Sequence, residues 1–299
     1  MGDKILKIGT VHQCNCCLGS KTLHPLVSVI DLSKAALSPH TDIKFGFYTL
    51  LLSECKCEAY TYGHQCYDFS DGTLVCLAPG ESISMKENDK RFPSKGWILA
   101  FHPDLICGTP LGLNIHNYTF FSYLPEEALH ISQREKQIIL EFLEKINQEL
   151  QRCIDRHSKK IISKYIELLL DYCIRFYERQ FITRNEANKK IIKEFNRLLD
   201  THISTKAIQS FGMLSYEYCA KFLHLSPAYL NDLLIYETGK SFNEYIQFKR
   251  FEIAKDWLQN TDKPLNQIAE ELGFSNSHYF SRLFKKITGC SPNEFRVPN

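Results

Sequence analysis

The sequence predicts an α+β protein, in which β structure comes first and helices fill the rest of the chain. Within the first 130 residues, short apolar and aromatic runs alternate with turn residues, as the strands of a sheet do. From Ser132 onward, apolar residues recur every three or four positions, which is the period of a helix that faces a core. Residues 215–299 also contain an internal repeat, and such a repeat indicates a duplicated supersecondary unit.

The β-rich part is expected to form a small barrel or sandwich, because several short strands follow one another between turns. The expected strands lie at residues 45–53, 74–78 and 97–101, with a looser alternation over residues 58–69. Pro79 and Gly80 close the second of these strands as a turn.

Three helices are expected in the middle of the chain. The first begins with a capping box formed by Ser132 and Glu135, and the others cover residues 158–179 and 185–200. The first helix carries one apolar stripe, formed by Ile138, Ile139, Phe142, Leu143, Ile146, Leu150 and Ile154. This stripe is either a dimerisation surface or an intradomain packing face, and the sequence leaves both open.

Length and composition fit a soluble protein of two or three domains. The chain has 299 residues, of which 44% are hydrophobic and 23% charged. We expect a β-rich domain over residues 1–130, a helical connector over 131–203 and a duplicated helical domain over 204–299. A formal charge of +2 gives no global signal for nucleic acid or for an anionic membrane.

Neither a membrane segment nor a secretory signal is evident. No apolar run approaches the roughly 20 residues of a membrane span, and no apolar stretch follows the first lysines. We therefore expect a cytoplasmic protein with no membrane partner and with reduced cysteines.

The repeat relates two stretches near the C-terminus. At a spacing of 49 residues, Ala220, Leu223 and Ser226 recur as Ala269, Leu272 and Ser275. At a spacing of 50 residues, Tyr229, Leu233, Thr238, Gly239, Ser241, Asn243 and Glu244 recur as Tyr279, Leu283, Thr288, Gly289, Ser291, Asn293 and Glu294. The slip of one residue is expected between Ser226 and Tyr229, where a turn can absorb it.

Each copy predicts a helix, a short turn and a second helix, which is a helix-turn-helix unit. Ser226 caps the second helix of the first copy, and Ser275 or Asn276 caps that of the second. Gly273 fits a left-handed turn, and Phe274 fills the space between the helices. The expected inner faces are Tyr229, Leu230, Leu233 and Leu234 in the first copy and Tyr279, Phe280, Leu283, Phe284 and Ile287 in the second.

A helix-turn-helix unit places its second helix in the major groove of DNA. Two such units on one connecting helix, expected over residues 242–258, can enter successive major-groove faces about 34 Å apart. The second copy is the more basic, because Arg282, Lys285, Lys286 and Arg296 are opposed only by Glu294.

Three stretches carry a resemblance to a known family: SPAYLNDLLIYETGKSFNEYI, RFEIAKDWL and IAEELGFSNSHYFSRLFKKITGCSPNEFR. Together they resemble the paired helix-turn-helix domain of the AraC/XylS-type transcription regulators. The resemblance implies a regulator that binds double-stranded promoter DNA in a sequence-specific way. It covers the C-terminal domain only.

The resemblance also implies which residues meet DNA. Base-facing positions are Ala228, Asn231, Asp232, Ser277, His278 and Arg282. Among these, Arg282 suits guanine, Asn231 suits adenine, and Asp232 can only accept a hydrogen bond, as from cytosine. Phosphate contacts are expected from Lys240, Arg250, Lys285, Lys286 and Arg296, with an intradomain ion pair or cap as the alternative for Arg250. Ile235 and Tyr236 stand where most family members have a basic residue, which predicts weaker binding by the first copy.

The stretch YGHQCYDFSDGTLVCLAPGES resembles the cupin-like barrel that many such regulators use as a sensor. The resemblance implies an N-terminal barrel that binds a small-molecule effector. Aromatic and polar residues that could line its pocket are His40, Lys44, Tyr48, Tyr60, His64 and Trp97. Gln65 and Cys66 follow His64 where metal cupins have a second His, so no metal or other cofactor is expected. No catalytic motif indicates an enzyme.

Eight cysteines in the first 130 residues leave a further interpretation open. They are Cys14, Cys16, Cys17, Cys55, Cys57, Cys66, Cys76 and Cys107. Their spacing does not match that of structural zinc ligands, so ordinary buried thiols are expected, with metal or redox sensing as the alternative.

The sequence thus predicts a regulator whose partners are promoter DNA, a small-molecule effector, a second copy of the chain and RNA polymerase. Effector binding is expected to change how the sensor, connector and DNA-binding domain are disposed, and so which DNA half-sites a dimer spans. A ligand-independent regulator is the alternative.

Overall fold

The computed structural model describes residues 5–35, 42–54, 68–84, 95–204 and 214–296. The chain forms two compact units, residues 1–184 and 185–299. The α+β prediction is confirmed, because the described strands belong to the first unit and the described elements of the second are helices. None of the helices in these ranges is long and apolar enough to cross a membrane.

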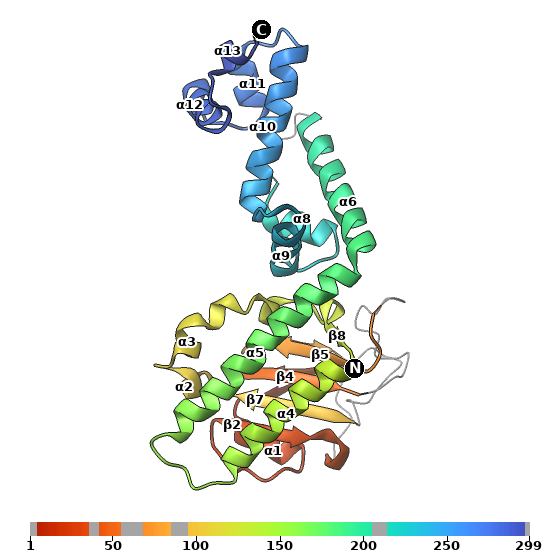
Figure 1. Cartoon of the computed structure of the whole chain (residues 1–299), viewed down its shortest axis with the longest axis vertical. Coiled ribbons are helices and arrows are strands. Elements are labelled where there is room, and N and C mark those ends of the chain that lie inside the picture. The colour runs from red at the N-terminus through yellow and green to blue at the C-terminus, as the bar shows by residue number, and fades with distance from the viewer. Residues whose placement is uncertain (1–4, 36–41, 55–67, 85–94, 205–213, 297–299) are drawn as a thin grey trace. The chain divides into compact units, whose positions relative to one another are not determined.

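Five antiparallel strands form the larger sheet of the first unit (Figure 1). Across the sheet they are β2 (Val27–Asp31), β7 (Gly96–Phe101), β4 (Tyr48–Ser53), β5 (Gly72–Leu77) and β8 (Leu129–Ile131). The strands expected at 74–78 and 97–101 are confirmed as β5 and β7.

A smaller sheet combines β1 (Ile5–Ile8), β3 (Asp42–Phe45) and β6 (Ser82–Ser84). The strand expected at residues 45–53 is thereby divided, because the chain leaves the smaller sheet at Phe45 and enters the larger one at Tyr48. Gly46 makes the crossing possible. Its N–H donates to the carbonyl of Ile8 at 2.8 Å, and a Cβ on Gly46 would lie 2.9 Å from the carbonyl oxygen of Gly9.

Helix α1 (Val11–Cys17) follows β1. Most of the alternation expected at 58–69 falls outside the described residues.

The larger sheet of the described residues is open, with β2 and β8 at opposite edges, so the strands do not close into the predicted barrel. Both faces of this sheet are buried. Leu51, Val75 and Ile98 pack in one cluster with residues of the smaller sheet, whereas their neighbours Leu50 and Leu99 pack in another cluster beneath helices. The strands are therefore apolar at consecutive positions, a pattern that does not reveal which face points inward.

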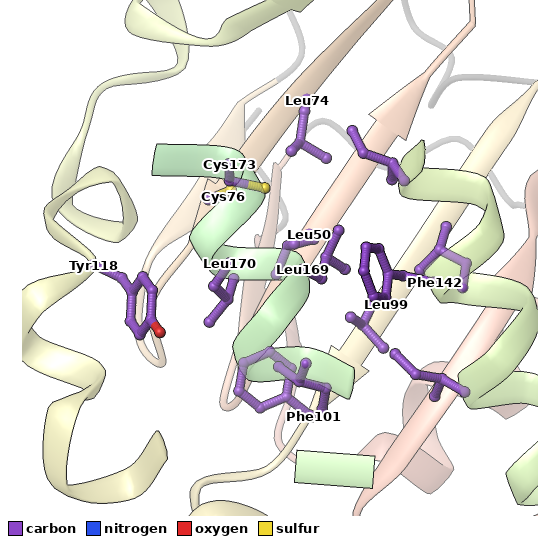
Figure 2. Close-up of a cluster of buried hydrophobic side chains, with 14 of the residues drawn as sticks. Leu50, Leu74, Cys76, Leu99, Phe101, Tyr118, Phe142, Leu169, Leu170 and Cys173 are labelled. Atoms are coloured by element: carbon purple, nitrogen blue, oxygen red, sulfur yellow. The ribbon is translucent and has the colours of Figure 1, made fainter. Parts of the chain in front are cut away.

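Helices α4 (Gln133–Leu150) and α5 (Ser158–Thr183) cover the outer face of the larger sheet. Figure 2 shows Phe142, Leu169 and Leu170 from these helices packed over strand residues such as Leu50 and Leu99. The predicted stripe of α4 is buried in this layer through Ile139, Phe142, Leu143, Ile146 and Leu150. It is an intradomain packing face and not a dimer surface, because the sheet occupies it. Ile154, its last expected member, is exposed.

Short elements connect the strands of the first unit. The α-helical ones are α2 (Pro103–Ile106) and α3 (Pro110–Asn114). The 3-10 turns are η1 (Leu32–Lys34), η3 (Ile115–Asn117), η4 (Thr119–Ser122) and η5 (Pro125–Glu127).

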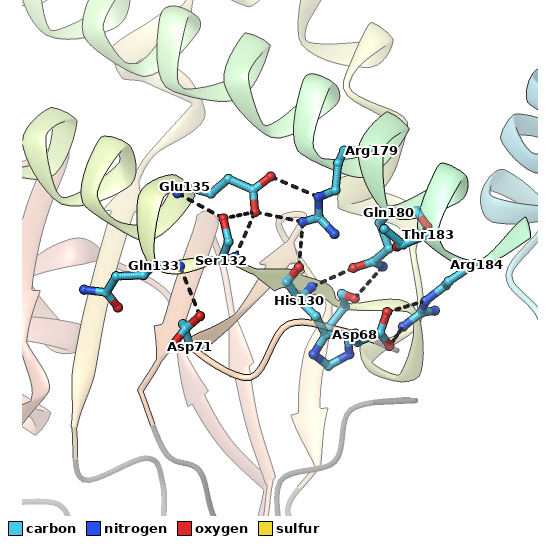
Figure 3. Close-up of polar contacts among 11 residues, drawn as sticks. Asp68, Asp71, His130, Ser132, Gln133, Glu135, Arg179, Gln180, Thr183 and Arg184 are labelled. Carbon is cyan, nitrogen blue, oxygen red and sulfur yellow. Dashed lines mark hydrogen bonds and ion pairs between the residues drawn. The ribbon is translucent and has the colours of Figure 1, made fainter. Parts of the chain in front are cut away.

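Side chains from α5 complete the edge strand β8 (Figure 3). The side-chain oxygen of Gln180 accepts from the His130 backbone N–H at 2.8 Å. The side-chain nitrogen of Gln180 donates to the Ala128 backbone carbonyl at 3.1 Å. Arg179 donates to the His130 carbonyl at 2.7 Å and pairs with Glu135 at 2.9 Å. An edge strand needs such cover because its backbone groups would otherwise remain unpaired.

The second unit contains α6 (Asn185–Ser204), α8 (Tyr216–Phe222), α9 (Pro227–Thr238), α10 (Phe242–Asn260), α11 (Leu265–Glu271), α12 (Ser277–Thr288) and α13 (Pro292–Arg296). It has two apolar cores. The first joins α6, α8, α9 and the start of α10, and the second joins the rest of α10 with α11 and α12. The residues expected to form a connector are therefore divided, since α4 and α5 belong to the first unit and α6 to the second.

Candidate nucleic-acid interface

Two helix-turn-helix units are present in the second unit, formed by α8 with α9 and by α11 with α12. Both turns use the same backbone hydrogen bond. The Leu225 N–H donates to the Ala220 carbonyl at 2.9 Å, and the Phe274 N–H donates to the Ala269 carbonyl at 2.8 Å. Ala220 and Ala269 are each 1% exposed, so their small size allows the helices to approach closely.

The second helix of each unit is capped at the same position. Ser226 accepts from the Tyr229 N–H at 3.1 Å, and Asn276 accepts from the Tyr279 N–H at 2.7 Å. Asn276 rather than Ser275 is thus the cap of α12. The one-residue slip of the repeat consequently lies before Ser226, and not after it as the sequence comparison suggested. Ser275 is the extra residue in the second turn.

The exposed face of α12 is basic. His278, Arg282, Lys285 and Lys286 are exposed on it, at spacings that keep them on one side of the helix. Ser277 is half-buried at the first position of the helix, and its carbonyl accepts from the Ser281 hydroxyl. His278, Arg282, Lys285 and Lys286, which are predicted DNA contacts, therefore lie on one surface of α12.

Two residues expected in the core of α12 are exposed instead. Tyr279 is 43% exposed and Ile287 is 55% exposed, although Tyr229, the repeat partner of Tyr279, is 3% exposed. The larger Phe280 stands at the repeat position of Leu230 in α9, and it fills the α12 core, with its ring centroid 5.0 Å from that of Phe274. The Arg282 guanidinium lies 5.8 Å from the Tyr279 ring centroid. Sequence reasoning therefore missed Tyr279 as a surface residue.

The exposed face of α9 differs in charge from that of α12. It carries exposed Ile235 and Tyr236 and half-buried Ala228, Asn231 and Asp232, with no Lys or Arg in the helix. The Asn231 side-chain oxygen accepts from the Phe242 N–H at 3.0 Å, so it ties α9 to the start of α10. A bidentate contact of Asn231 with adenine would require this hydrogen bond to break.

Arg250 does not lie on the surface, where a phosphate contact is expected. Its side chain is 6% exposed, its Nε donates to the Leu272 carbonyl at 2.8 Å, and its guanidinium lies 3.7 Å from the Phe274 ring centroid. Burial lowers the pKa of Arg250 to about 10. This contact matches the alternative of an intradomain cap, because Leu272 is the C-cap residue of α11.

Two of the other four expected phosphate contacts also have partners within the second unit. The Lys240 ammonium lies 4.9 Å from the Phe248 ring centroid and donates to the Thr238 carbonyl at 3.4 Å. Arg296 donates to the Lys263 carbonyl. Both side chains are half-buried, which leaves Lys285 and Lys286 as the exposed cations of the predicted set.

The expected effector pocket is not assembled by the residues that the structure describes. Lys44 is exposed on the smaller sheet, whereas Tyr48 and Trp97 pack on the helix-covered face of the larger sheet. The Tyr48 ring stacks on Phe101 with centroids 5.1 Å apart. The remaining three residues, His40, Tyr60 and His64, lie outside the described residues.

The described cysteines are free thiols. Burial raises the pKa of Cys14 and of Cys173 to about 12, and it raises that of Cys76 as well, so these thiols stay protonated. Cys16 and Cys107 are exposed, while Cys55, Cys57 and Cys66 lie outside the described residues. Within the described ranges, no three His, Cys, Asp or Glu side chains gather as a metal site requires.

The family called Helix-turn-helix domain matches residues 219–297 of this chain. This range begins within α8 and continues through α9 to α12. Residues 185–299 therefore contain a DNA-binding domain of the helix-turn-helix class. The uncharacterized HTH-type transcriptional regulator YtdP of Bacillus subtilis (strain 168) is 33% identical over 112 residues, which are 38% of this chain and 14% of YtdP.

Two Escherichia coli (strain K12) proteins extend the comparison. The arabinose operon regulatory protein is 32% identical over 142 residues, covering 45% of this chain and 46% of that protein. The uncharacterized HTH-type transcriptional regulator YijO is 26% identical over 227 residues, covering 75% of this chain and 76% of YijO. Residues 219–297 thus form a helix-turn-helix domain, and the chain is similar to HTH-type transcriptional regulators and to the arabinose operon regulatory protein. Its matches span less than half the length of YtdP and of the arabinose operon regulatory protein.

Proposed function

We propose that the protein binds promoter DNA through two unequal helix-turn-helix units, of which the α12 unit makes the stronger contact. The observation that carries this proposal is the difference between the two exposed helix faces. The α12 face presents Arg282, Lys285 and Lys286, whereas α9 presents Ile235 and Tyr236 at its exposed positions. Lys and Arg side chains that neutralise DNA phosphates supply a large share of the affinity for DNA. Because these cations lie on α12 and not on α9, the α12 unit dominates binding.

Within the α12 unit, Arg282 is the base-reading residue, because a guanidinium can donate two hydrogen bonds to guanine. Tyr279 lies beside it and limits the positions of the guanidinium. His278 and Ser277, near the start of α12, are the further base contacts, since that end of a recognition helix enters the groove. Lys285 and Lys286 contact phosphates, which fix the register of the helix without reading sequence.

Ala228 and Asp232 are the base-facing residues of the α9 unit in this proposal. Neither attracts phosphate, and Asp232 can only accept a hydrogen bond from a base edge. The α9 unit therefore adds specificity at one or two positions and little affinity.

Selection of bound sequences from random DNA with the full-length protein tests the proposal. We expect one asymmetric motif, with a strongly preferred half and a weakly preferred half about one helical turn apart. Ile235→Lys adds a cation to α9 and should raise affinity for all sequences, whereas the matched change Ile161→Lys in the first unit should not. Two equally strong half-motifs, or no enrichment at all, would contradict the proposal.

The first unit supplies regulation in this proposal. A small-molecule effector bound there changes the affinity for DNA, and a second copy of the chain and RNA polymerase are the protein partners in the cytoplasm. No enzymatic activity is part of this function. Titration calorimetry of the effector with and without DNA tests the coupling, because linkage requires the same factor in both directions. Equal affinity in both titrations would favour a ligand-independent regulator.

A further inference from the structure

A pocket of about 530 Å³ lies in the first unit, beside the start of α5. One wall is the segment of residues 107–111, which leads from α2 into α3, and the other is residues 156–167, which lead into α5 and form its first turns. Figure 1 shows α2 and α3 next to this half of α5. The volume lies in the range of sites that hold small molecules.

The pocket is strongly basic. Four cations line it, namely Arg156, Lys159, Lys160 and Lys164, and the one carboxylate among its lining residues is Glu167. Lys164 pairs with that carboxylate at 3.6 Å, and Lys159 donates to the Asp104 carbonyl at 3.1 Å. A net charge of about +3 thus surrounds a space that can hold an anion.

Ser163 is a second and independent sign of a ligand. Its side chain lines the pocket, it is 2% exposed, and its hydroxyl oxygen has no hydrogen-bond partner. A buried hydroxyl without a partner is unfavourable, so most buried hydroxyls in proteins are paired. An oxyanion in the pocket would accept the hydrogen bond that the Ser163 hydroxyl has to give.

The opposite wall is fixed rather than adaptable. The Thr109 hydroxyl donates to the Ile106 carbonyl at 2.6 Å and accepts from the Gly112 N–H at 3.2 Å. Gly108 precedes it with a φ of +74°, and a Cβ on Gly112 would lie 2.1 Å from the Ile106 carbonyl oxygen. This wall is therefore held in one shape, and Ser163 remains the polar group that a ligand can engage.

We propose that this pocket binds a small organic phosphate. A phosphate monoester carries a charge between about −1.5 and −2 at neutral pH and three acceptor oxygens, which suits one hydroxyl donor and several cations better than a single carboxylate does. The remaining volume accommodates an organic part of sugar size. The pocket is distinct from the expected site at Lys44, Tyr48 and Trp97. That its ligand is the effector rests on the proposed function, whereas the binding site itself does not.

Calorimetric titration of the full-length protein at constant ionic strength tests the site. The probes are glucose 6-phosphate, inorganic phosphate, gluconate and glucose. We expect saturable binding of both phosphates, tighter for glucose 6-phosphate, with weaker binding of gluconate and none of glucose. Tighter binding of gluconate than of either phosphate, or no saturable binding of the phosphates, would overturn the proposal.

Variants connect the binding to the pocket. Ser163→Ala removes the unpaired hydroxyl without leaving a large cavity, so the fold should be at least as stable while glucose 6-phosphate binds about tenfold more weakly. Lys160→Gln should also weaken binding several-fold. Lys145→Gln, which removes an exposed lysine of α4 outside the pocket, should not. Equal losses of affinity for glucose 6-phosphate in Lys160→Gln and Lys145→Gln would show that surface charge alone attracts the phosphate, and would overturn the site.

A DNA titration of the same preparations separates this inference from the proposed function. Weaker phosphate binding by Ser163→Ala, with unchanged DNA binding by the unliganded protein, supports the site. Phosphate binding by a protein that selects no DNA sequence would contradict the proposed function and leave the site supported. DNA selection without phosphate binding would overturn the site alone.

Discussion

His224 and Gly273 occupy the same left-handed position in the turns of the two helix-turn-helix units, with φ angles of +56° and +72°. They lie 49 residues apart, and in each turn the next residue donates its N–H to the carbonyl of a buried alanine. Among the described residues, His224 is the one non-glycine residue with a positive φ. Its Cβ makes this conformation unfavourable, whereas glycine adopts it freely. The first turn is therefore strained where the second is not.

This relationship predicts opposite effects of two substitutions. His224→Gly should raise the free energy of unfolding of the second unit by about 0.5–1 kcal/mol, because it removes the left-handed strain. Gly273→Ala should lower it by about 1–2 kcal/mol for the same reason. The chain has two tryptophans, so Trp257 fluorescence in a Trp97→Phe background reports urea unfolding of the second unit. A loss of stability in His224→Gly would show that the imidazole makes a contact worth more than the strain.

Arg250 should behave as a structural residue in the second unit. Arg250→Ala leaves the Leu272 carbonyl without its charged donor, and we expect a loss of about 1.5–3 kcal/mol in the free energy of unfolding. At a temperature where the variant stays folded, the salt dependence of DNA binding should be unchanged, because no phosphate contact is lost.

Lys286→Ala is the matched comparison for Arg250→Ala. It removes an exposed cation of α12, so it should leave stability unchanged and reduce the salt slope of DNA binding by about 1. A reduced salt slope in Arg250→Ala would restore the phosphate contact that the sequence suggested.

The burial of Arg250 illustrates what a single sequence can and cannot predict. The repeat at spacings of 49 and 50 was enough to predict two helix-turn-helix units, the Ser226 cap and the left-handed turn at Gly273, because these depend on local residue types. It could not show that Tyr229 is buried and Tyr279 exposed, because burial depends on tertiary packing, and the residues after them, Leu230 and Phe280, belong to different cores. The position of Arg250 likewise depends on tertiary contacts with Leu272 and Phe274.

The first unit shows the same limit. Residues 74–78 and 97–101 predicted strands correctly, but consecutive apolar residues such as Leu50 and Leu51 fit either a barrel or a sheet covered on both faces. The helices that cover one face are α4 and α5, which the sequence suggested as a separate connector. The basic pocket beside α5 was missed because its lining comes from two segments about 50 residues apart.

Arg282 should determine preference at one base pair. Arg282→Ala should cost about 1–3 kcal/mol in affinity for the preferred sequence and relax the preference at a single position. Arg282→Lys keeps the charge without the bidentate geometry, so it should retain the salt slope and lose most of the preference. Competition binding with single-base variants of the selected site measures both effects. Equal losses on selected and random DNA for Arg282→Ala would contradict a base-reading role.

Two repeated capping boxes should make the second unit sensitive to acid. Hydrogen bonds from Ser241 lower the pKa of the Glu244 carboxyl below its usual 4.5, and those from Ser291 do the same for Glu294. Because the folded-state pKa lies below the unfolded value, protons bind the unfolded state more tightly. This stabilisation is complete above about pH 4.5 and is lost as the pH falls through the lowered pKa of each folded-state carboxyl.

Urea unfolding between pH 3 and 6, followed by Trp257 fluorescence, measures the acid effect. Glu244→Gln and Glu294→Gln should each flatten the pH dependence, while Glu270→Gln, an exposed change on α11, should leave it as in the unsubstituted protein. An unchanged slope in both capping variants would show that other groups cause the loss.

The ion pair between Asp68 and Arg184 should be the most sensitive polar contact of the first unit. Arg184 is the C-cap residue of α5, and its guanidinium contacts both carboxylate oxygens of Asp68, at 3.0 and 2.6 Å (Figure 3). Asp68→Asn leaves a buried guanidinium without its counter-charge, so we expect a loss of about 3–5 kcal/mol. Trp97 fluorescence in a Trp257→Phe background measures it. The double variant Asp68→Leu with Arg184→Met should recover most of that loss, because an apolar pair needs no compensation for desolvated charge. If the double variant is as unstable as Asp68→Asn, the loss comes from packing around the C-terminal end of α5 and not from the unpaired charge.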